Sequence, residues 1–355
     1  MDKTAKDFLK AILSQPSPSG YEQPVRRVIE PYMKKHADKV KTDVHGNTWG
    51  VLNEKGTPRV MLAGHCDEIG LMVTYINDKG YIAFAAVGGV NVPLLQGSRV
   101  NIHTPDGNVP GVIAVKPIHL MSSEERSKSK SKIHDLWIDI GAKDKKDAEK
   151  AVRVGDVATI DVGFTELRNG LAASRGFDDR IGAFVVSETL RLLSKKKKSL
   201  KAGVYAVATV QEEIGLRGGH TAAYGVDPDV GIAVDVGFAS DCPDVNKNQV
   251  GDIKLGGGPV LHRGPNINPV VEDLLERAAK KARIKVQMQA EPRGTGTDAN
   301  AIQLARGGKA AALISIPNRY MHSPAEVLCL KDAADTAKLL AQFITDLKPG
   351  QSFLP

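Results

Sequence analysis

The chain has 355 residues, of which 42% are hydrophobic and 25% are charged, and its formal net charge is +7. This length predicts a globular protein with two domains, because a single hydrophobic core seldom grows to this size. No stretch approaches the roughly 18 to 20 apolar residues that cross a bilayer, and the first residues lack the apolar segment of a signal peptide. We therefore expect a cytoplasmic protein that does not contact membranes.

The cysteines and the basic residues argue against two further classes of protein. The three cysteines, Cys66, Cys242 and Cys329, are widely spaced, which disfavours a disulfide framework or a cysteine zinc site and predicts buried reduced thiols. Much of the positive charge lies in short runs at 143–150 and 195–198. Neither run carries interleaved aromatic residues, so solvated helix ends or loops are favoured over a nucleic-acid site.

The first part of the chain changes from a helical to a β-type pattern. Apolar residues at helical spacing predict helices over about 3–14 and 22–36. Short β-type segments follow, with Gly and Pro between them, and they predict a small all-β barrel or sandwich. These segments are 71–76, 81–86, 99–103, 111–115 and 157–162. The polar low-complexity run at 122–132 predicts a mobile loop within this β region.

From about residue 180 helices and strands alternate, which predicts an α/β fold with a mixed sheet flanked by helices. The predicted helices are 180–194, 268–283, 298–306 and 332–347. Residues before and after the β region are both needed to complete one site. We therefore expect a discontinuous α/β domain of residues 1–71 and 165–355, with a β domain of residues 72–164 inserted into it.

The candidate functional residues lie where predicted strands end. In open α/β sheets, ligands gather outside the carboxyl ends of the strands, so residues that are distant in sequence can converge there. The residues that follow or close the predicted strands 60–63, 204–210, 230–234 and 313–317 are His65, Asp67, Glu212, Glu213, Asp235 and His322.

Among these residues are two pairs, each of which combines a candidate metal ligand with a second functional carboxylate. His65 and Asp67 are two apart in an extended segment and face the same side, so Asp67 could accept the second ring N–H of a metal-bound His65. Turn chemistry at a strand end explains this pair equally well. Glu212 and Glu213 are neighbours whose side chains diverge, so one could bind a metal while the other acts as a base. Solvated loop acids are the alternative, and the glycines at 215 and 218–219 are expected to allow a tight turn.

The remaining candidates complete a set of metal-type ligands. Asp235 ends an apolar strand, where a carboxylate is costly unless it is paired or bound to metal. Asp178 and Asp179 open a predicted helix, where a lone acidic pair usually caps the backbone. His322 alone could be a loop residue. Together these residues suit two divalent ions about 3.5 to 4 Å apart that activate water for hydrolysis.

Five motifs in this order resemble the M42 family of dinuclear metallo-aminopeptidases, and the resemblance covers essentially the whole chain. The motifs are GHCDEIG at 64–70, FDDRIG at 177–182, QEEIGLRGG at 211–219, VDV at 234–236 and MHSPAEV at 321–327. The resemblance implies a zinc-peptidase-like catalytic domain with an inserted PDZ-like β domain. It also implies hydrolysis of peptides that have a free N-terminus.

The resemblance also implies a role for each candidate residue. His65 and Asp235 would bind one metal, Glu213 and His322 the other, and Asp178 would bridge the two, although the sequence alone leaves Asp179 open as the bridge. Glu212 would be the general base, and Asp67 would orient His65. Family members use two zinc or cobalt ions, and they form homododecamers built from dimers that the inserted domain joins.

Several alternatives share part of this pattern. An M18-type aminopeptidase, an M20-type carboxypeptidase or a deacylase would use a similar ligand set, although the lid domain of an M20-type enzyme falls later in the chain. A non-catalytic assembly or nucleic-acid-binding protein on the same scaffold is disfavoured by the complete ligand set. The segment 293–299 resembles a Gly-Thr-Asp-Ala segment near the family's substrate, and helix capping by Thr297 or Asp298 explains it equally well.

Overall fold

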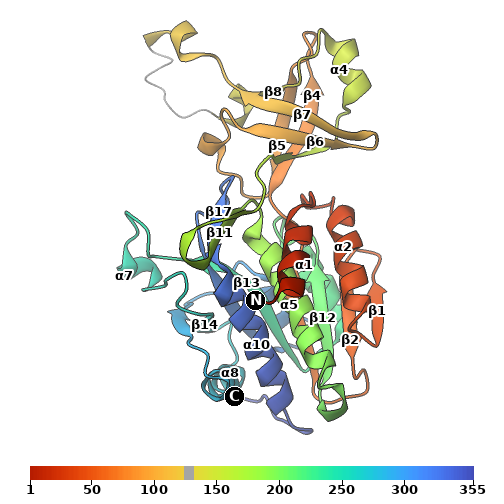
Figure 1. The fold of residues 1–355 in the computed structure, drawn as a ribbon, viewed down its shortest axis with the longest axis vertical. Helices are drawn as coiled ribbons and strands as arrows, with labels where there is room; N and C mark the ends of the chain where they lie inside the picture. The colour runs from red at the N-terminus through yellow and green to blue at the C-terminus, as the bar shows by residue number, and fades with distance from the viewer. Residues whose placement is uncertain (124–131) are drawn as a thin grey trace.

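The computed structural model describes residues 1–123 and 132–355, so the loop predicted over 122–132 lies almost entirely outside the described residues (Figure 1). The α-helices are α1 (Lys3–Leu13), α2 (Gln23–Lys34), α4 (Lys145–Ala151), α5 (Phe177–Ser194), α6 (Arg217–Val226), α7 (Lys247–Val250), α8 (Pro269–Ala282), α9 (Asp298–Gln303) and α10 (Leu330–Asp346). The first nine strands are β1 (Lys39–Thr42), β2 (Thr48–Leu52), β3 (Arg59–His65), β4 (Gly70–Ile76), β5 (Ile82–Val87), β6 (Arg99–Thr104), β7 (Gly107–Ala114), β8 (Trp137–Asp139) and β9 (Val157–Ile160). The others are β10 (Thr165–Glu166), β11 (Leu171–Ser174), β12 (Gly203–Thr209), β13 (Val230–Phe238), β14 (Val260–Arg263), β15 (Gln287–Ala290), β16 (Ala310–Arg319) and β17 (Glu326–Cys329).

A mixed sheet of eleven strands forms the larger part of the molecule. Its main path runs in the order β1-β2-β12-β3-β13-β16-β17-β11-β10, and β14 and β15 branch from β16. The four central strands, β12, β3, β13 and β16, are parallel, and the flanking β2, β14 and β17 run antiparallel to them. The carboxyl ends of the parallel strands therefore meet at one edge of the sheet, as the sequence predicts.

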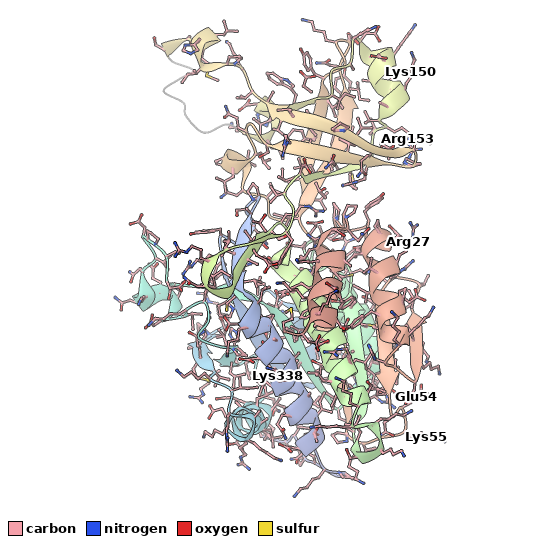
Figure 2. All side chains as sticks on the ribbon, in the orientation of Figure 1. Arg27, Glu54, Lys55, Lys150, Arg153 and Lys338 are labelled. Atoms are coloured by element: carbon pink, nitrogen blue, oxygen red, sulfur yellow. The ribbon has the colours of Figure 1, made fainter. Side chains whose placement is uncertain are left out.

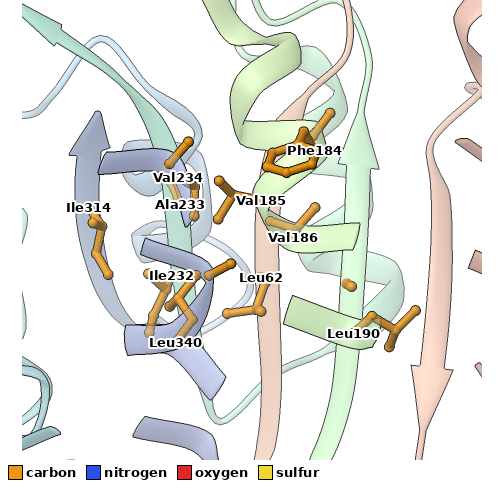
Figure 3. Packing of buried hydrophobic residues seen from close by; sticks show 14 of the residues in the cluster. Leu62, Phe184, Val185, Val186, Leu190, Ile232, Ala233, Val234, Ile314 and Leu340 are labelled. Carbon is orange, nitrogen blue, oxygen red and sulfur yellow. The ribbon is translucent and has the colours of Figure 1, made fainter. Parts of the chain in front are cut away.

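Helices cover both faces of the sheet because its central strands are apolar on both sides. Leu62 of β3 faces α5 and α10, where it joins Val186 and Leu340 in the largest core cluster (Figure 3). Its neighbours Met61 and Ala63 point to the opposite face, into a smaller cluster formed with α6 and α9. Successive residues of a strand alternate between faces, so one short apolar segment supplies both cores.

The β region forms a closed six-stranded barrel with the strand order β4-β5-β8-β7-β6-β9, and it stands at one end of the molecule in Figure 1. The barrel has its own core, in which Val73, Ile82, Ile102 and Ile138 are buried. The prediction of an α/β fold with a mixed sheet and a small all-β barrel is therefore confirmed.

Several local predictions differ from the structure. The region predicted to contain only strands includes α4, which holds much of the basic run at 143–150. The sequence also missed α6, because glycines at 218 and 219 lie in its first turn and make the segment resemble a loop. All three cysteines are free thiols, but only Cys66 and Cys329 are buried.

The charged residues lie mainly on the surface of both parts. Figure 2 shows Lys150 and Arg153 on the barrel, and Glu54 and Lys55 at the far end of the sheet domain. The four lysines at 195–198 are exposed, as the sequence predicts. Within the described residues, no helix is both long enough and apolar enough to span a membrane.

Candidate metal centre and cleft

His65, the last residue of β3, faces three carboxylates at the carboxyl edge of the sheet. Its Nε2 atom lies 3.3 Å from Asp178 Oδ1, 3.8 Å from Glu212 Oε2 and 4.0 Å from Asp235 Oδ1. The His65 side chain is only 2% exposed. The three carboxylates come from the start of α5, the loop after β12 and strand β13, so with β3 the fold brings together residues from four separate segments.

His322, in the loop after β16, forms the second half of the cluster. Its Nε2 atom lies 3.2 Å from Asp178 Oδ2 and 3.4 Å from Glu213 Oε2. The two carboxylate oxygens of Asp178 therefore face different histidines, Oδ1 toward His65 and Oδ2 toward His322. All five predicted metal ligands lie in one cluster.

The adjacent residues Asp178 and Asp179 have different environments. Asp178 has φ −73° and ψ 108°, outside the helical region, and a cis peptide bond joins it to Asp179. Asp179 Oδ1 accepts a hydrogen bond from the backbone N–H of Gly182 at 3.0 Å, and its Oδ2 accepts one from that of His65 at 3.1 Å. Asp179 thus caps the helix and anchors β3, whereas the Asp178 side chain faces the two histidines.

Small residues allow these segments to approach closely. A Cβ atom on Gly64 of β3 would overlap the backbone of Gly182 in α5, and a Cβ atom on Gly182 would lie 2.5 Å from the carbonyl oxygen of Val234. Gly218 and Gly219 serve the same purpose, since a Cβ atom on either would overlap Val210 or Asp298. The expectation that these two glycines allow a tight turn is wrong, because they lie in a helix and are needed for space.

Asp67 is fully buried next to the cluster and holds several of its residues in position. Its carboxylate accepts hydrogen bonds from Ser19 Oγ at 2.7 Å and from the backbone N–H groups of Glu212 at 3.1 Å and Glu213 at 3.2 Å. His65 Nδ1 lies 3.4 Å from Asp67 Oδ1 and 3.1 Å from the Asp67 carbonyl oxygen. Asp67 therefore contacts His65 and also holds the two adjacent glutamates.

Asp235 does not end its strand, contrary to the sequence-based expectation. Strand β13 continues to Phe238 because it pairs with β16 over its full length. Its pairing with β3, however, stops at Ala233. The sheet therefore opens beside Asp235, which places this carboxylate next to His65 although it lies within the strand.

Two contributions to the cluster were missed by the sequence analysis. Glu326 of β17 is 1% exposed, and it accepts hydrogen bonds from the backbone N–H groups of Asp178 at 2.8 Å and His322 at 3.1 Å. The available signal was its place in the MHSPAEV motif at 321–327, four residues after His322. Gly88 and Gly89, after barrel strand β5, lie against Glu213 and His322, and only the folded structure brings them there.

The protonation of the cluster reflects its burial. Burial raises the pKa of Glu212 to about 10, of Glu213 to about 9 and of Asp235 to about 8, and neighbouring carboxylates add to each shift. Burial alone would also raise the pKa of Asp178, but hydrogen bonds from His322 and His65 lower it to about 2. Burial alone would lower the pKa of His65, and the surrounding carboxylates raise it well above its usual value.

These residues fit divalent cations. Carboxylate and imidazole groups are ligands for zinc and related ions, and a bound cation would compensate the mutual repulsion of the buried carboxylates. Glu213 Oε1 is buried and has no hydrogen-bond partner among the described residues. An unpaired buried oxygen is costly, and a metal ion would satisfy it.

The cluster forms one wall of a cleft of about 560 Å³. The turn before α9 contributes to its lining through residues that include Thr295 and Thr297. Thr297 is the N-cap of α9, and its hydroxyl accepts a hydrogen bond from the backbone N–H of Ala299. This segment therefore both caps the helix and borders the cleft.

A buried cluster of histidines and carboxylates at the carboxyl edge of an α/β sheet, open to a cleft, is typical of a metal-dependent hydrolase. Residues 46–339 match the model of the M42 glutamyl aminopeptidase family. The chain belongs to this family, and it is a hydrolase that removes N-terminal residues.

Individual relatives match over nearly the whole chain. The chain is 39% identical to a lysyl aminopeptidase of Pyrococcus furiosus over 346 residues, which cover 97% of each protein. The crystal structure of a TET aminopeptidase from the marine sediment archaeon Thaumarchaeota archaeon SCGC AB-539-E09 superposes with a TM-score of 0.92 at 36% identity, covering 97% of this chain and 96% of the other. The Pyrococcus horikoshii TET1 peptidase can assemble into a tetrahedron or a large octahedral shell. Its structure superposes with a TM-score of 0.86 at 34% identity, and the match covers 97% of this chain and 100% of the other.

Proposed function

We propose that this protein is a dinuclear aminopeptidase that binds two divalent ions, zinc or cobalt. His65 and Asp235 would hold one ion, and Glu213 and His322 the other. The observation that carries this proposal is the position of Asp178, whose two oxygens face His65 and His322 at 3.3 and 3.2 Å. A carboxylate between two sets of ligands suits a bridge between two ions.

Glu212 is the residue we assign as general base. When bound, the ions would supply Lewis acidity, which polarises a peptide carbonyl and lowers the pKa of water. Glu212 is largely buried, but it lines the cleft beside His65, so a substrate bound in the cleft would lie next to its carboxylate. The positive charge of the bound ions would oppose the rise in the pKa of Glu212, so its ionised carboxylate would accept a proton from the attacking water and deliver it to the nitrogen of the leaving amine. Asp67 would keep both His65 and the backbone of Glu212 in position.

A comparison of free and N-acetylated peptides tests this proposal. The purified protein is stripped with a chelator, reloaded with Zn²⁺ or Co²⁺, and assayed on each peptide while bound metal is counted by elemental analysis. We expect two ions per chain and hydrolysis of the free peptides alone. Hydrolysis of the acetylated peptides would instead indicate a deacylase or carboxypeptidase, and a single bound ion would refute the dinuclear assignment.

We also propose that the chain forms a dodecamer built from dimers, with the barrel making the dimer contacts. The support is its likeness to TET peptidases, one of which was solved as a dodecamer at 33% identity with a TM-score of 0.85. Light scattering coupled to size-exclusion chromatography should then give about twelve times the 38.0 kDa mass of one chain. A stable monomer or dimer at micromolar concentration would contradict this proposal.

A further inference from the structure

In the described part of the chain, one acidic residue of the cleft lining lies outside the predicted metal cluster. This residue is Glu291, which follows strand β15 and lies near the turn at 293–297. Among the described residues that line the cleft, none is Lys or Arg. If the cluster carboxylates were balanced by two divalent ions, Glu291 would remain as an unbalanced negative charge in the cleft.

The Glu291 carboxylate is held in place by neighbouring side chains. Its Oε1 atom accepts a hydrogen bond from Gln289 Nε2 at 2.8 Å and lies 3.5 Å from His262 Nδ1. His262 is fixed in turn by Ser315 Oγ, 2.8 Å from its other ring nitrogen. Both contacts to Glu291 are made at Oε1, which leaves Oε2 available to accept a hydrogen bond from a ligand. Its side chain is 26% exposed.

Contacts also fix the backbone of Glu291 and favour the ionised form of its carboxylate. Its N–H donates to the carbonyl of Arg263 at 2.8 Å, and Gly264 packs so closely against its carbonyl that a Cβ atom there would overlap it. The His262 ring, whose Nδ1 lies 3.5 Å from Oε1, lowers the pKa of Glu291 despite the opposing effect of burial. Glu291 is therefore a positioned carboxylate that is ionised at neutral pH.

The strand order separates Glu291 from the predicted metal cluster by a defined span. Asp235 on β13 is paired with Ser315 on β16, and the next strands outward are β14 and β15. In the pairing register Asp235 is level with Gln287 of β15, and Glu291 lies four residues beyond Gln287. Three strand spacings of about 4.8 Å and four residues of about 3.3 Å each put the two backbones roughly 20 Å apart, and side chains from both ends shorten this span. Phe238 and Met321 supply apolar surface in the cleft. A long side chain with an apolar stem and a polar head fits this span better than a short one.

We infer that Glu291 binds the side chain of a basic N-terminal residue, so that the enzyme prefers peptides that begin with lysine or arginine. This inference rests on the proposed aminopeptidase function. The apolar walls contact the methylene groups of the substrate, and the Glu291 carboxylate accepts a charge-assisted hydrogen bond from its cationic head.

Chromogenic Lys, Arg, Leu and Glu substrates with the metal-loaded protein test this inference. The wild type should show its highest kcat/KM with Lys or Arg. Glu291→Gln preserves size and can still accept the hydrogen bond from Gln289. It should lower kcat/KM for Lys and Arg by about 10- to 100-fold, mainly through KM, since a hydrogen bond to a charged group is lost. Glu291→Lys should reverse the charge preference and improve hydrolysis of the Glu substrate.

The controls separate this inference from the function on which it rests. Glu54→Gln, an exposed substitution at the far end of the molecule, should leave all four rates unchanged (Figure 2). A wild-type preference for Leu or Glu, or an equal loss on all four substrates in Glu291→Gln, would overturn the assignment of Glu291 while aminopeptidase activity stands. Failure of the wild type to hydrolyse any of the four would refute the proposed function itself.

Discussion

Replacing Glu326 should weaken the metal centre far more than it weakens the fold. This buried carboxylate accepts backbone hydrogen bonds from both Asp178 and His322, at 2.8 and 3.1 Å, and so joins the two sides of the cluster. In Glu326→Gln one oxygen can still accept a hydrogen bond, but the new NH₂ group faces the other backbone N–H. One of the two predicted ligands therefore loses its anchor.

The size of the effect follows from these contacts. A buried N–H group that is left without an acceptor costs about 1 to 3 kcal/mol. With an unfolding entropy of about 2.1 cal/mol/K per residue, this cost lowers the Tm of a chain of 355 residues by only about 1 to 4 °C. Loss of a group that orients metal ligands typically costs 10- to 100-fold in metal affinity or activity. We expect a loss of that order in kcat/KM for Glu326→Gln.

Asp332→Asn is the matched control, because Asp332 is also buried and accepts hydrogen bonds from two backbone N–H groups, those of Gly256 at 2.7 Å and Gly258 at 3.0 Å. It does not line the cleft. Differential scanning fluorimetry should show similar Tm losses for both variants, and only Glu326→Gln should lose activity and metal. Equal activity in the two variants would refute the assigned role of Glu326.

Three further variants test other parts of the site. Glu212→Gln should retain both metal ions but lose most turnover, so near wild-type rates would rule out Glu212 as the base. His322→Ala should lose one metal equivalent by elemental analysis, and an unchanged count would remove this residue from the ligand set. Gly182→Ala should destabilise the protein by about 1 to 3 kcal/mol in urea denaturation, because its Cβ atom would overlap the Asp179 carboxylate. Gly163→Ala, where a Cβ atom meets open space, is the control, and equal stability of the two variants would contradict the packing argument.

Most of the fold could be predicted from patterns of neighbouring residues. The central strands read as apolar runs, and the long helices α1, α2, α8 and α10 have the expected spacing, with observed bounds within about two residues of the predicted ones. The helix α6 could not be predicted in this way. Its glycines disfavour a helix locally, but contacts with Val210 and Asp298 require them.

For the candidate site, the sequence predicted the residues but not all of their roles. The types and order of its residues can be read from five motifs, and the structure brings all seven named residues together. The sequence could not rank Asp178 above Asp179, because adjacent acids at a helix start look alike. The environments differ only in the folded chain, where Asp179 accepts hydrogen bonds from His65 and Gly182.

The sequence by itself determined the chemical groups, the strands that carry them and the family of the protein. These properties depend on residue identity and short-range spacing, and both can be read directly from the sequence. Only the tertiary structure decided which carboxylates face the histidines, that Glu326 supports both sides of the cluster and that Glu291 lines the same cleft. These properties depend on strand order and on hydrogen bonds between residues far apart in sequence, such as that between Asp178 and Glu326, which no local pattern records.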